Sequence, residues 1–453
     1  MNSDMKSRVA APSSKAIVAA LGVFKPKIFQ SIGLHGNTKW QLHVLCGAAI
    51  AWAWSIEPTL TGRYASALTT LALWFPTCFA ASSYQGFIKA LVTRSPQMLP
   101  LVQRIFRRRM EDLPGAWKIG RWVCFAVDGT KVELPWTAAL ETSFGLTNTP
   151  KRARPKRKKR SANSLAHQAV RPQAFLTLLW HVASGLPWTW RIGAVGASER
   201  DTLRDMLEDL PANALLLGDA GFNGYDLWRQ IIASRRHFLI RVGRNVTLLK
   251  KLGYRVDVKD DAVYLWPETA PNRLGPPLVL RMVKFRTASS TMCVVTDLTD
   301  GQLSDKQATE LYRRRWGVEG FFRGFKQTYR RRKLLSESPA QVRCELEWSL
   351  VGLWLISLTA AEELIRAGET PDRMSVAGVL RVAQRACGRE MTRAEWRQCL
   401  RAAVKDTYKR KSSKQARHPQ RKKRQLPCGE PNVVKATTEQ RRKANSSINR
   451  SRR

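Results

Sequence analysis

The sequence is poor in acidic residues, and this deficit is its clearest compositional feature. Its 453 residues include 35 Asp and Glu against 77 Lys and Arg, which gives a formal net charge of +42. Such a balance is not typical of a generic enzyme. It indicates a polyanionic partner, DNA or RNA, rather than a small anionic substrate.

The sequence also lacks paired cysteines and long apolar runs. None of the eight cysteines forms a CxxC pair, and the six histidines do not cluster with them. We therefore expect no zinc site, and reduced thiols in a cytoplasmic protein. The longest mainly apolar runs cover about 10 to 14 residues, whereas a membrane span needs roughly 20. The apolar stretch Ala16 to Phe24 is followed by Lys-Pro-Lys without a small-residue cleavage site, so secretion is not expected either.

Two aspartates follow apolar runs that are typical of strands. Asp128 comes after Trp122 to Val127 and precedes Gly129, so it is either displayed at a strand end or part of an Asp-Gly hairpin turn. Asp219 comes after the continuous apolar run Ala214 to Leu217. In open α/β sheets ligands bind at the carboxyl ends of such strands, although Asp219 could equally cap the helix that follows.

The stretch from Ser304 to Lys333 predicts one amphipathic helix with Ser304 or Asp305 as its N-cap. One polar face stands out, because its residues lie within about 60° of one another at roughly 100° per residue. Its members are Tyr312, Arg315, Glu319 and Lys326. A solvated, salt-bridged helix is the alternative interpretation. The many arginines of this helix repel one another unless a polyanion neutralises them, so a glutamate among them favours a catalytic or metal-binding role.

Asp128, Asp219 and Glu319 together form a carboxylate set in a strongly cationic chain. Mg²⁺ and Mn²⁺ prefer carboxylate oxygens and relieve the repulsion between like charges. Two such ions can drive in-line displacement at a phosphodiester, while Arg and Lys hold the neighbouring phosphates. The residues therefore predict a two-metal phosphodiester chemistry.

These motifs resemble the DDE transposases of bacterial insertion sequences, specifically the insertion-sequence-four group. Asp128 in VDGT resembles the first acid of that family, Asp219 in GDAGF the second and Glu319 the third. The family's helical signature, Tyr-x2-Arg-x3-Glu-x6-Lys, is matched by Tyr312, Arg315, Glu319 and Lys326. The resemblance covers about Arg121 to Leu364.

The resemblance implies an α/β protein with an RNase H-like mixed-sheet catalytic core and a β-rich insertion. It implies a transposase that cleaves DNA at insertion-sequence ends and transfers the strands into target DNA, in some members through a hairpin. Asp128, Asp219 and Glu319 would bind two Mg²⁺ or Mn²⁺ ions, and Tyr312, Arg315 and Lys326 would bind DNA. Double-stranded DNA, as terminal inverted repeats and target, would be the partner of a homodimer in a synaptic complex, in the bacterial cytoplasm at the nucleoid and without a membrane.

Two alternatives remain open at this point. One is a DNA-binding protein descended from a transposase that has lost catalysis, and the other is an RNase H-like nuclease without strand transfer. The intact carboxylate set argues against the first, because a binding module needs no such acids.

Composition divides the chain into six segments. The predicted segments are residues 1–115, an all-α N-terminal domain that could bind DNA ends; 116–236, the first part of the core, with a basic loop at 151–160; 237–300, the β-rich insertion; 301–365, the rest of the core; 366–405, a helical segment; and 406–453, a disordered basic tail. The loop Lys151 to Arg160 has eight cations in ten residues, and the tail has 16 cations against three acids. Neither can bury enough apolar surface to fold alone, and both should attract phosphates.

Overall fold

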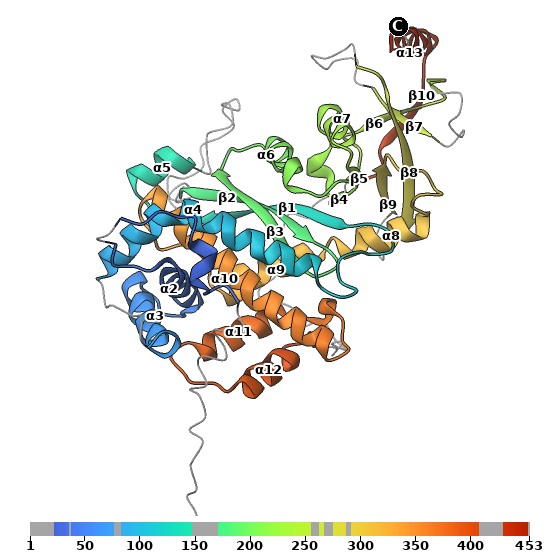
Figure 1. Ribbon diagram of the computed structural model, residues 1–453. Helices are drawn as coiled ribbons and strands as arrows, with labels where there is room; N and C mark the ends of the chain where they lie inside the picture. Colours follow the sequence, from blue (N-terminus) through green and yellow to red (C-terminus); the bar gives the residue numbers. More distant parts are fainter. Residues whose placement is uncertain are drawn as a thin grey trace, which may run out of the picture.

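A ten-stranded mixed sheet forms the centre of the protein (Figure 1). The computed structural model describes residues 22–35, 38–76, 83–146, 171–254, 262–266, 275–286, 291–406 and 429–451. The strands are β1 (Cys124–Glu133), β2 (Gln173–His181), β3 (Leu186–Ala194), β4 (Leu215–Gly218), β5 (His237–Val242), β6 (Thr247–Lys250), β7 (Val263–Leu265), β8 (Leu278–Arg286), β9 (Thr291–Thr296) and β10 (Asn432–Lys435).

The central strands have the predicted RNase H-like arrangement. Their order in the sheet is β3-β2-β1-β4-β5, with β1, β2 and β3 antiparallel and β4 and β5 parallel to β1. β4 and most of β2 are continuous buried apolar runs, as expected for strands covered on both faces. The fold class inferred from the sequence is confirmed by this topology.

The hairpin interpretation of Asp128-Gly129 is wrong. β1 runs straight through both residues to Glu133, and Asp128 lies opposite Leu178 of β2. The long partner strand β2 keeps β1 extended, because every residue from Phe125 to Glu133 finds a pairing partner. Gly129 serves close approach instead of a turn, since a Cβ there would overlap the ring of Phe175.

Helices cover both faces of the sheet. Figure 1 shows α6 (Glu199–Met206) and α7 (Tyr225–Ala233) on one face, with the N-terminal and C-terminal helices gathered on the other. The second group comprises α2 (Leu42–Trp54), α3 (Leu60–Trp74), α4 (Tyr84–Glu111), α10 (Pro339–Arg366), α11 (Val376–Ala386) and α12 (Arg393–Ala402), while α5 (Ala138–Phe144) follows β1. These helices and the sheet share one hydrophobic core.

The helix α10 is the apolar centre of the second group. Ser338 caps its N-terminus and Pro339 opens its first turn. It is the one described helix that is long and apolar enough to cross a membrane, and 89% of its apolar window is buried inside the protein. This burial is what a core helix of a folded domain requires.

A buried ion pair ties α10 to the N-terminal helices. The carboxylate of Glu345 is fully buried, and its Oε1 accepts a hydrogen bond from Arg63 Nη1 on α3 at 2.8 Å. Its Oε2 accepts the backbone N–H groups of Leu335 and Ser336, both at 3.0 Å. The pair is therefore satisfied on every side, which a buried charge requires.

The sheet continues from β5 through β9 and β8 to β7 and β6, which form the β-rich insertion. The C-terminal strand β10 pairs in parallel with β6 at the edge of this insertion, and α13 (Thr438–Ser451) follows. Ala436 and Ala444 are buried in a small separate cluster with Leu249 and Tyr264. The disordered tail predicted from residue 406 is thus wrong for this last part, because the unpaired edge of β6 gives the chain a place to bind.

Two basic segments lie outside the described residues. They are the predicted loop Lys151 to Arg160 and residues 407–428 of the tail. Their predicted contacts with phosphates stay predictions.

The buried pair of Arg63 and Glu345 should dominate the stability of the helical side. Glu345→Ala leaves a buried guanidinium without its counter-ion and should lower the free energy of unfolding by about 3–5 kcal/mol. Glu369→Ala is the matched control, because Glu369 pairs with Arg373 at the surface, where such a pair contributes about 1 kcal/mol or less. Urea denaturation followed by tryptophan fluorescence measures both, and equal midpoints for the two variants would contradict the expectation.

Candidate active site

The sheet aligns Asp128 and Asp219. β1 and β4 are parallel neighbours in which Ala126 pairs with Leu217. Each aspartate lies two residues beyond that pair, so both come level at the same edge of the sheet and start from the same face. The alignment follows from strand register and needs no contact between the two side chains.

Local hydrogen bonds orient both carboxylates. Gly129 N–H donates to Asp128 Oδ1 at 2.9 Å, and Gly221 N–H donates to Asp219 Oδ1 at 2.8 Å. Asp219 is also the N-cap of the short helix Ala220–Phe222. The two interpretations of Asp219, strand-end carboxylate and helix cap, therefore both hold.

The predicted single helix from Ser304 to Lys333 is wrong in two respects, because the helix is broken and because helical structure ends at Thr328. Ser304 is the N-cap, and its capping box with Gln307 confirms the predicted start. The chain then forms three consecutive pieces, α8 (Asp305–Arg314), α9 (Gly317–Arg323) and a π-helical turn (Gly324–Thr328).

Tertiary packing explains the break. A Cβ at Gly317 would overlap the indole of Trp180 on β2, and a Cβ at Gly324 would lie 2.5 Å from Val376 Cγ1 on α11. Both glycines let the backbone approach a neighbouring element, and both weaken a regular helix. The π turn is a common way to accommodate one extra residue near a functional site.

Arg315 connects the helix to the carboxylates. Its guanidinium is buried, with a side-chain exposure of 8%, and its Nη2 lies 3.4 Å from Glu319 Oε1. The same group lies 5.6 Å from the centre of the Tyr312 ring. Arg315 also lowers the pKa of Asp128, so it acts on carboxylates from both the helix and the sheet.

The prediction that Tyr312 contacts DNA disagrees with its position. Tyr312 is 1% exposed, and its hydroxyl donates to the carbonyl of Gly218 at 3.3 Å, one residue before Asp219. A buried ring cannot reach a phosphate. The hydroxyl instead anchors α8 to the end of β4, and burial raises the pKa of Tyr312 to about 12, which keeps it protonated as a donor.

Glu319 and Lys326 remain accessible. The Glu319 side chain is 48% exposed, and Lys326 is half-buried in the π turn. Burial, reinforced by Arg332, lowers the pKa of Lys326, while Asp128 and Glu133 raise it. Lys326 therefore lies within electrostatic range of Asp128.

The other two carboxylates act on Asp128. Burial raises the pKa of Asp128 to about 6, Arg315 and the Gly129 N–H lower it, and Asp219 and Glu319 add to the rise. The structure thus brings Asp128, Asp219, Glu319, Arg315 and Lys326 into one region.

This donor set fits a hard divalent cation in its chemistry. Carboxylate oxygens are the preferred ligands of Mg²⁺ and Mn²⁺, and a cation would offset the burial and the neighbouring acids that raise the pKa of Asp128. As the side chains lie, no three Asp, Glu, His or Cys groups within the described ranges are close enough to hold one ion. Small side-chain rotations would have to accompany binding.

One acidic residue near the site was missed by sequence reasoning. Glu199 is the first residue of α6. The sequence around it does not indicate a site, because Ser198 and the acids after it are typical of a helix start. In the structure its carboxylate lies close to Gly129 and Gly221, beside Asp219. The sequence signal that could have found it is the glycine that accompanies each aspartate.

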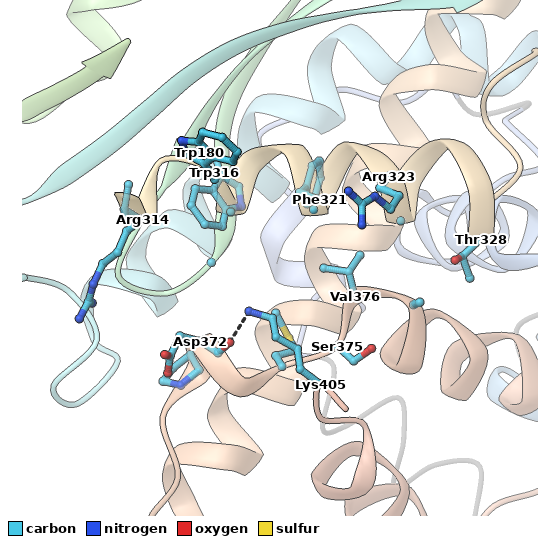
Figure 2. A pocket seen from close by; sticks show the side chains of 18 of the residues that line it. Trp180, Arg314, Trp316, Phe321, Arg323, Thr328, Asp372, Ser375, Val376 and Lys405 are labelled. Atoms are coloured by element: carbon cyan, nitrogen blue, oxygen red, sulfur yellow. Dashed lines mark hydrogen bonds between the residues drawn. The ribbon is translucent and has the colours of Figure 1, made fainter. Parts of the chain in front are cut away.

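A cationic cavity of about 650 Å³ adjoins α9 (Figure 2). Trp316 and Arg323, three residues before and four residues after Glu319, lie on its wall. Trp316 is 54% exposed, and Arg314 and Lys405 add further cations. Cations beside an exposed aromatic ring are typical of nucleic-acid surfaces.

The raised pKa of Asp128 predicts a pH dependence of stability in the metal-free protein. The folded state holds a proton on Asp128 up to about pH 6, whereas the unfolded chain releases it near pH 4. The contribution of Asp128 to stability should therefore be largest below about pH 4 and be lost as the pH rises from about 4 to about 7, by on the order of 2 kcal/mol. Asp128→Asn should lack that part of the fall. Urea midpoints in chelator at both pH values test this, and identical pH dependences would contradict it.

Comparison with known proteins places the chain. A family model described as the transposase DDE domain matches residues 123–355, more than half of the chain. The chain is 26% identical over 196 residues to the transposase InsG for insertion sequence element IS4 of Escherichia coli (strain K12), and the match covers 40% of this chain and 43% of that relative, less than half its length. Among solved structures it is similar to a cryo-EM structure of the piggyBac transposase synaptic complex with hairpin DNA, at a TM-score of 0.39 and 10% identity over 92% of this chain and 90% of that one. The chain therefore belongs to the family of proteins with a transposase DDE domain.

Proposed function

We propose that this chain is a transposase that cleaves DNA at the ends of an insertion sequence and joins the freed ends to target DNA. The observation that carries the proposal is the convergence of Asp128, Asp219 and Glu319 around Arg315 at one edge of an RNase H-like sheet. Membership of the transposase DDE family supports it.

In this proposal the three acids hold two Mg²⁺ or Mn²⁺ ions. When bound, such ions supply activation of an attacking hydroxyl and stabilisation of the leaving 3′ oxygen. Asp128 must first lose the proton that its buried surroundings favour, so its raised pKa predicts weaker cation binding below about pH 6.

The basic residues of the signature take different roles. Arg315 is enclosed and pairs with Glu319, so it orients that carboxylate and limits the repulsion between the acids. Lys326 is accessible and lies near Asp128, so it can hold a phosphate of the reacting strand. Tyr312 positions the helix through the Gly218 carbonyl.

Double-stranded DNA is the proposed partner, as the terminal inverted repeats of the element and as target. The net charge of +42 supports a polyanion, and Arg323, a helical neighbour of Glu319, lies on the wall of the cavity that contains Trp316. Pairing of two DNA ends would need a homodimer in a synaptic complex.

The catalytic assignment predicts a separation of cleavage from binding. Asp128→Asn, Asp219→Asn and Glu319→Gln should each lower cleavage of linear DNA bearing the inverted repeats by roughly a thousandfold or more, because each removes a proposed ion ligand. DNA affinity should change little. Asp226→Asn, an exposed acid on α7, is the control.

Cleavage that persists in one of these three variants with Mg²⁺ present would remove that residue from the assignment. Cleavage without joining in the unchanged protein would favour the nuclease alternative. Binding without cleavage in the unchanged protein would favour the non-catalytic alternative.

Lys326 and Arg314 should give different defects. Lys326→Ala should slow single-turnover cleavage on saturating DNA by roughly a hundredfold, because a preorganised cation acts on developing charge. Arg314 is exposed on α8 and is not among the groups that act on Asp128, so Arg314→Ala should weaken DNA binding by about fivefold or less. Equal defects of affinity in both variants, with normal rates at saturation, would refute a role for Lys326 in the chemical step.

A further inference from the structure

Glu199 reaches the candidate site from the opposite side to Glu319. Successive side chains of a strand point to opposite faces of the sheet. The Asp128 side chain lies on the Arg315 side, so a side chain at position 129 would point to the opposite face. A Cβ on Gly129 would overlap Glu199 Oε1. Figure 1 shows α6, which begins with Glu199, and α9 on opposite faces of β1.

A second glycine opens the same space. A Cβ on Gly221 would lie 2.9 Å from Asp219 Oδ1 and 3.4 Å from Glu199 Oε2. The carboxylate of Glu199 thus lies between Gly129, which follows Asp128, and Gly221, whose N–H donates to Asp219. Any side chain at position 129 would push it away, and one at position 221 would crowd it.

The Glu199 carboxylate has no protein partner of its own. Within the described part of the chain, no group donates a hydrogen bond to it and no cation lies in ion-pair distance, although it is half-buried. A half-buried acid beside a like charge, without a donor, is an unfavourable arrangement unless a ligand compensates it.

Asp219 is the residue that both sets of acids share. The strand register aligns it with Asp128 on β1, and a Cβ on Gly221 would lie within 3.4 Å of both Asp219 Oδ1 and Glu199 Oε2. Two ions bound at neighbouring positions need a shared carboxylate and further acids on each side of it. Asp128 and Glu319 stand on one side of Asp219, and Glu199 stands on the other.

We propose that Glu199 is a fourth carboxylate of the divalent-cation site and serves the ion on the α6 side of Asp219. The inference rests on the proposed function, which supplies the cations. It extends that function, because the family signature contains only three acids.

The competing explanation is that Glu199 only stabilises the start of α6. An acid in the first turn interacts favourably with the helix dipole wherever it points. Asp201 is the matched control, because it lies in the same first turn, is exposed and pairs with Arg204. A dipole effect should make Glu199→Gln and Asp201→Asn alike, whereas a cation site should separate them.

The test measures Mn²⁺ binding to the full chain without DNA, by electron paramagnetic resonance of the free ion. Glu199→Gln keeps the size of the side chain and removes its charge, so it should weaken the binding of one ion by roughly tenfold or more. Asp201→Asn should bind as the unchanged protein does. Glu199→Asp, which restores the charge, should recover part of the lost affinity, and this recovery shows that a folding defect is not the cause.

Glu199→Gln that binds Mn²⁺ like Asp201→Asn, while Asp219→Asn loses binding, overturns the role of Glu199 and leaves the three-acid site intact. Unchanged binding in Asp219→Asn as well overturns the metal assignment of the proposed function itself. A parallel measurement of cleavage against Mg²⁺ concentration should show a higher half-saturating concentration for Glu199→Gln, and an unchanged one counts against the proposal.

Discussion

The buried guanidinium of Arg315 is the constraint on which the geometry of the candidate site depends. Several carboxylates meet at one edge of the sheet, and burial favours the protonated form of Asp128. Arg315 lowers the pKa of Asp128 and pairs with Glu319, so it makes ionised acids tolerable there. It cannot neutralise all of them. The site therefore keeps a local negative charge inside a chain of net charge +42, which suits small cations at the centre and DNA around it.

The position of the signature helix depends in turn on the N-terminal helices. Arg331, just after the π turn, is fully buried, and burial lowers its pKa to about 10. Its guanidinium donates to the carbonyls of Ala53 on α2 and Tyr329, and to Ser349 Oγ on α10. Because Lys326 lies five residues before this anchor, its distance from Asp128 is set partly by α2 and α10. The N-terminal helices thus act on the site as structural support.

The sequence predicted the parts of the site that local rules decide. The cap at Ser304, the buried run before Asp219 and the spacing from Tyr312 to Lys326 all follow from propensity and periodicity, and the structure has each of them. It could not predict what distant partners decide. The break before Gly317 depends on Trp180, and the extension of β1 through Gly129 depends on β2. The strand β10 forms because β6 offers an edge nearly two hundred residues earlier in the chain.

The difference between local rules and distant partners also explains why the sequence did not predict the burial of Tyr312 or the position of Glu199 near Asp219. A helical wheel places Tyr312 on the face of Glu319, but it does not say that this face packs against the end of β4, where the Gly218 carbonyl accepts the Tyr312 hydroxyl. Glu199 has no periodic relation to the other acids, since it comes from a helix on the other side of the sheet. Its proximity shows only through the glycines that follow Asp128 and Asp219, whose missing side chains leave room for its carboxylate. Glycines one or two residues after an acid therefore carry information about such a site in addition to the acids themselves. A carboxylate that approaches the backbone closely needs a neighbour without a Cβ.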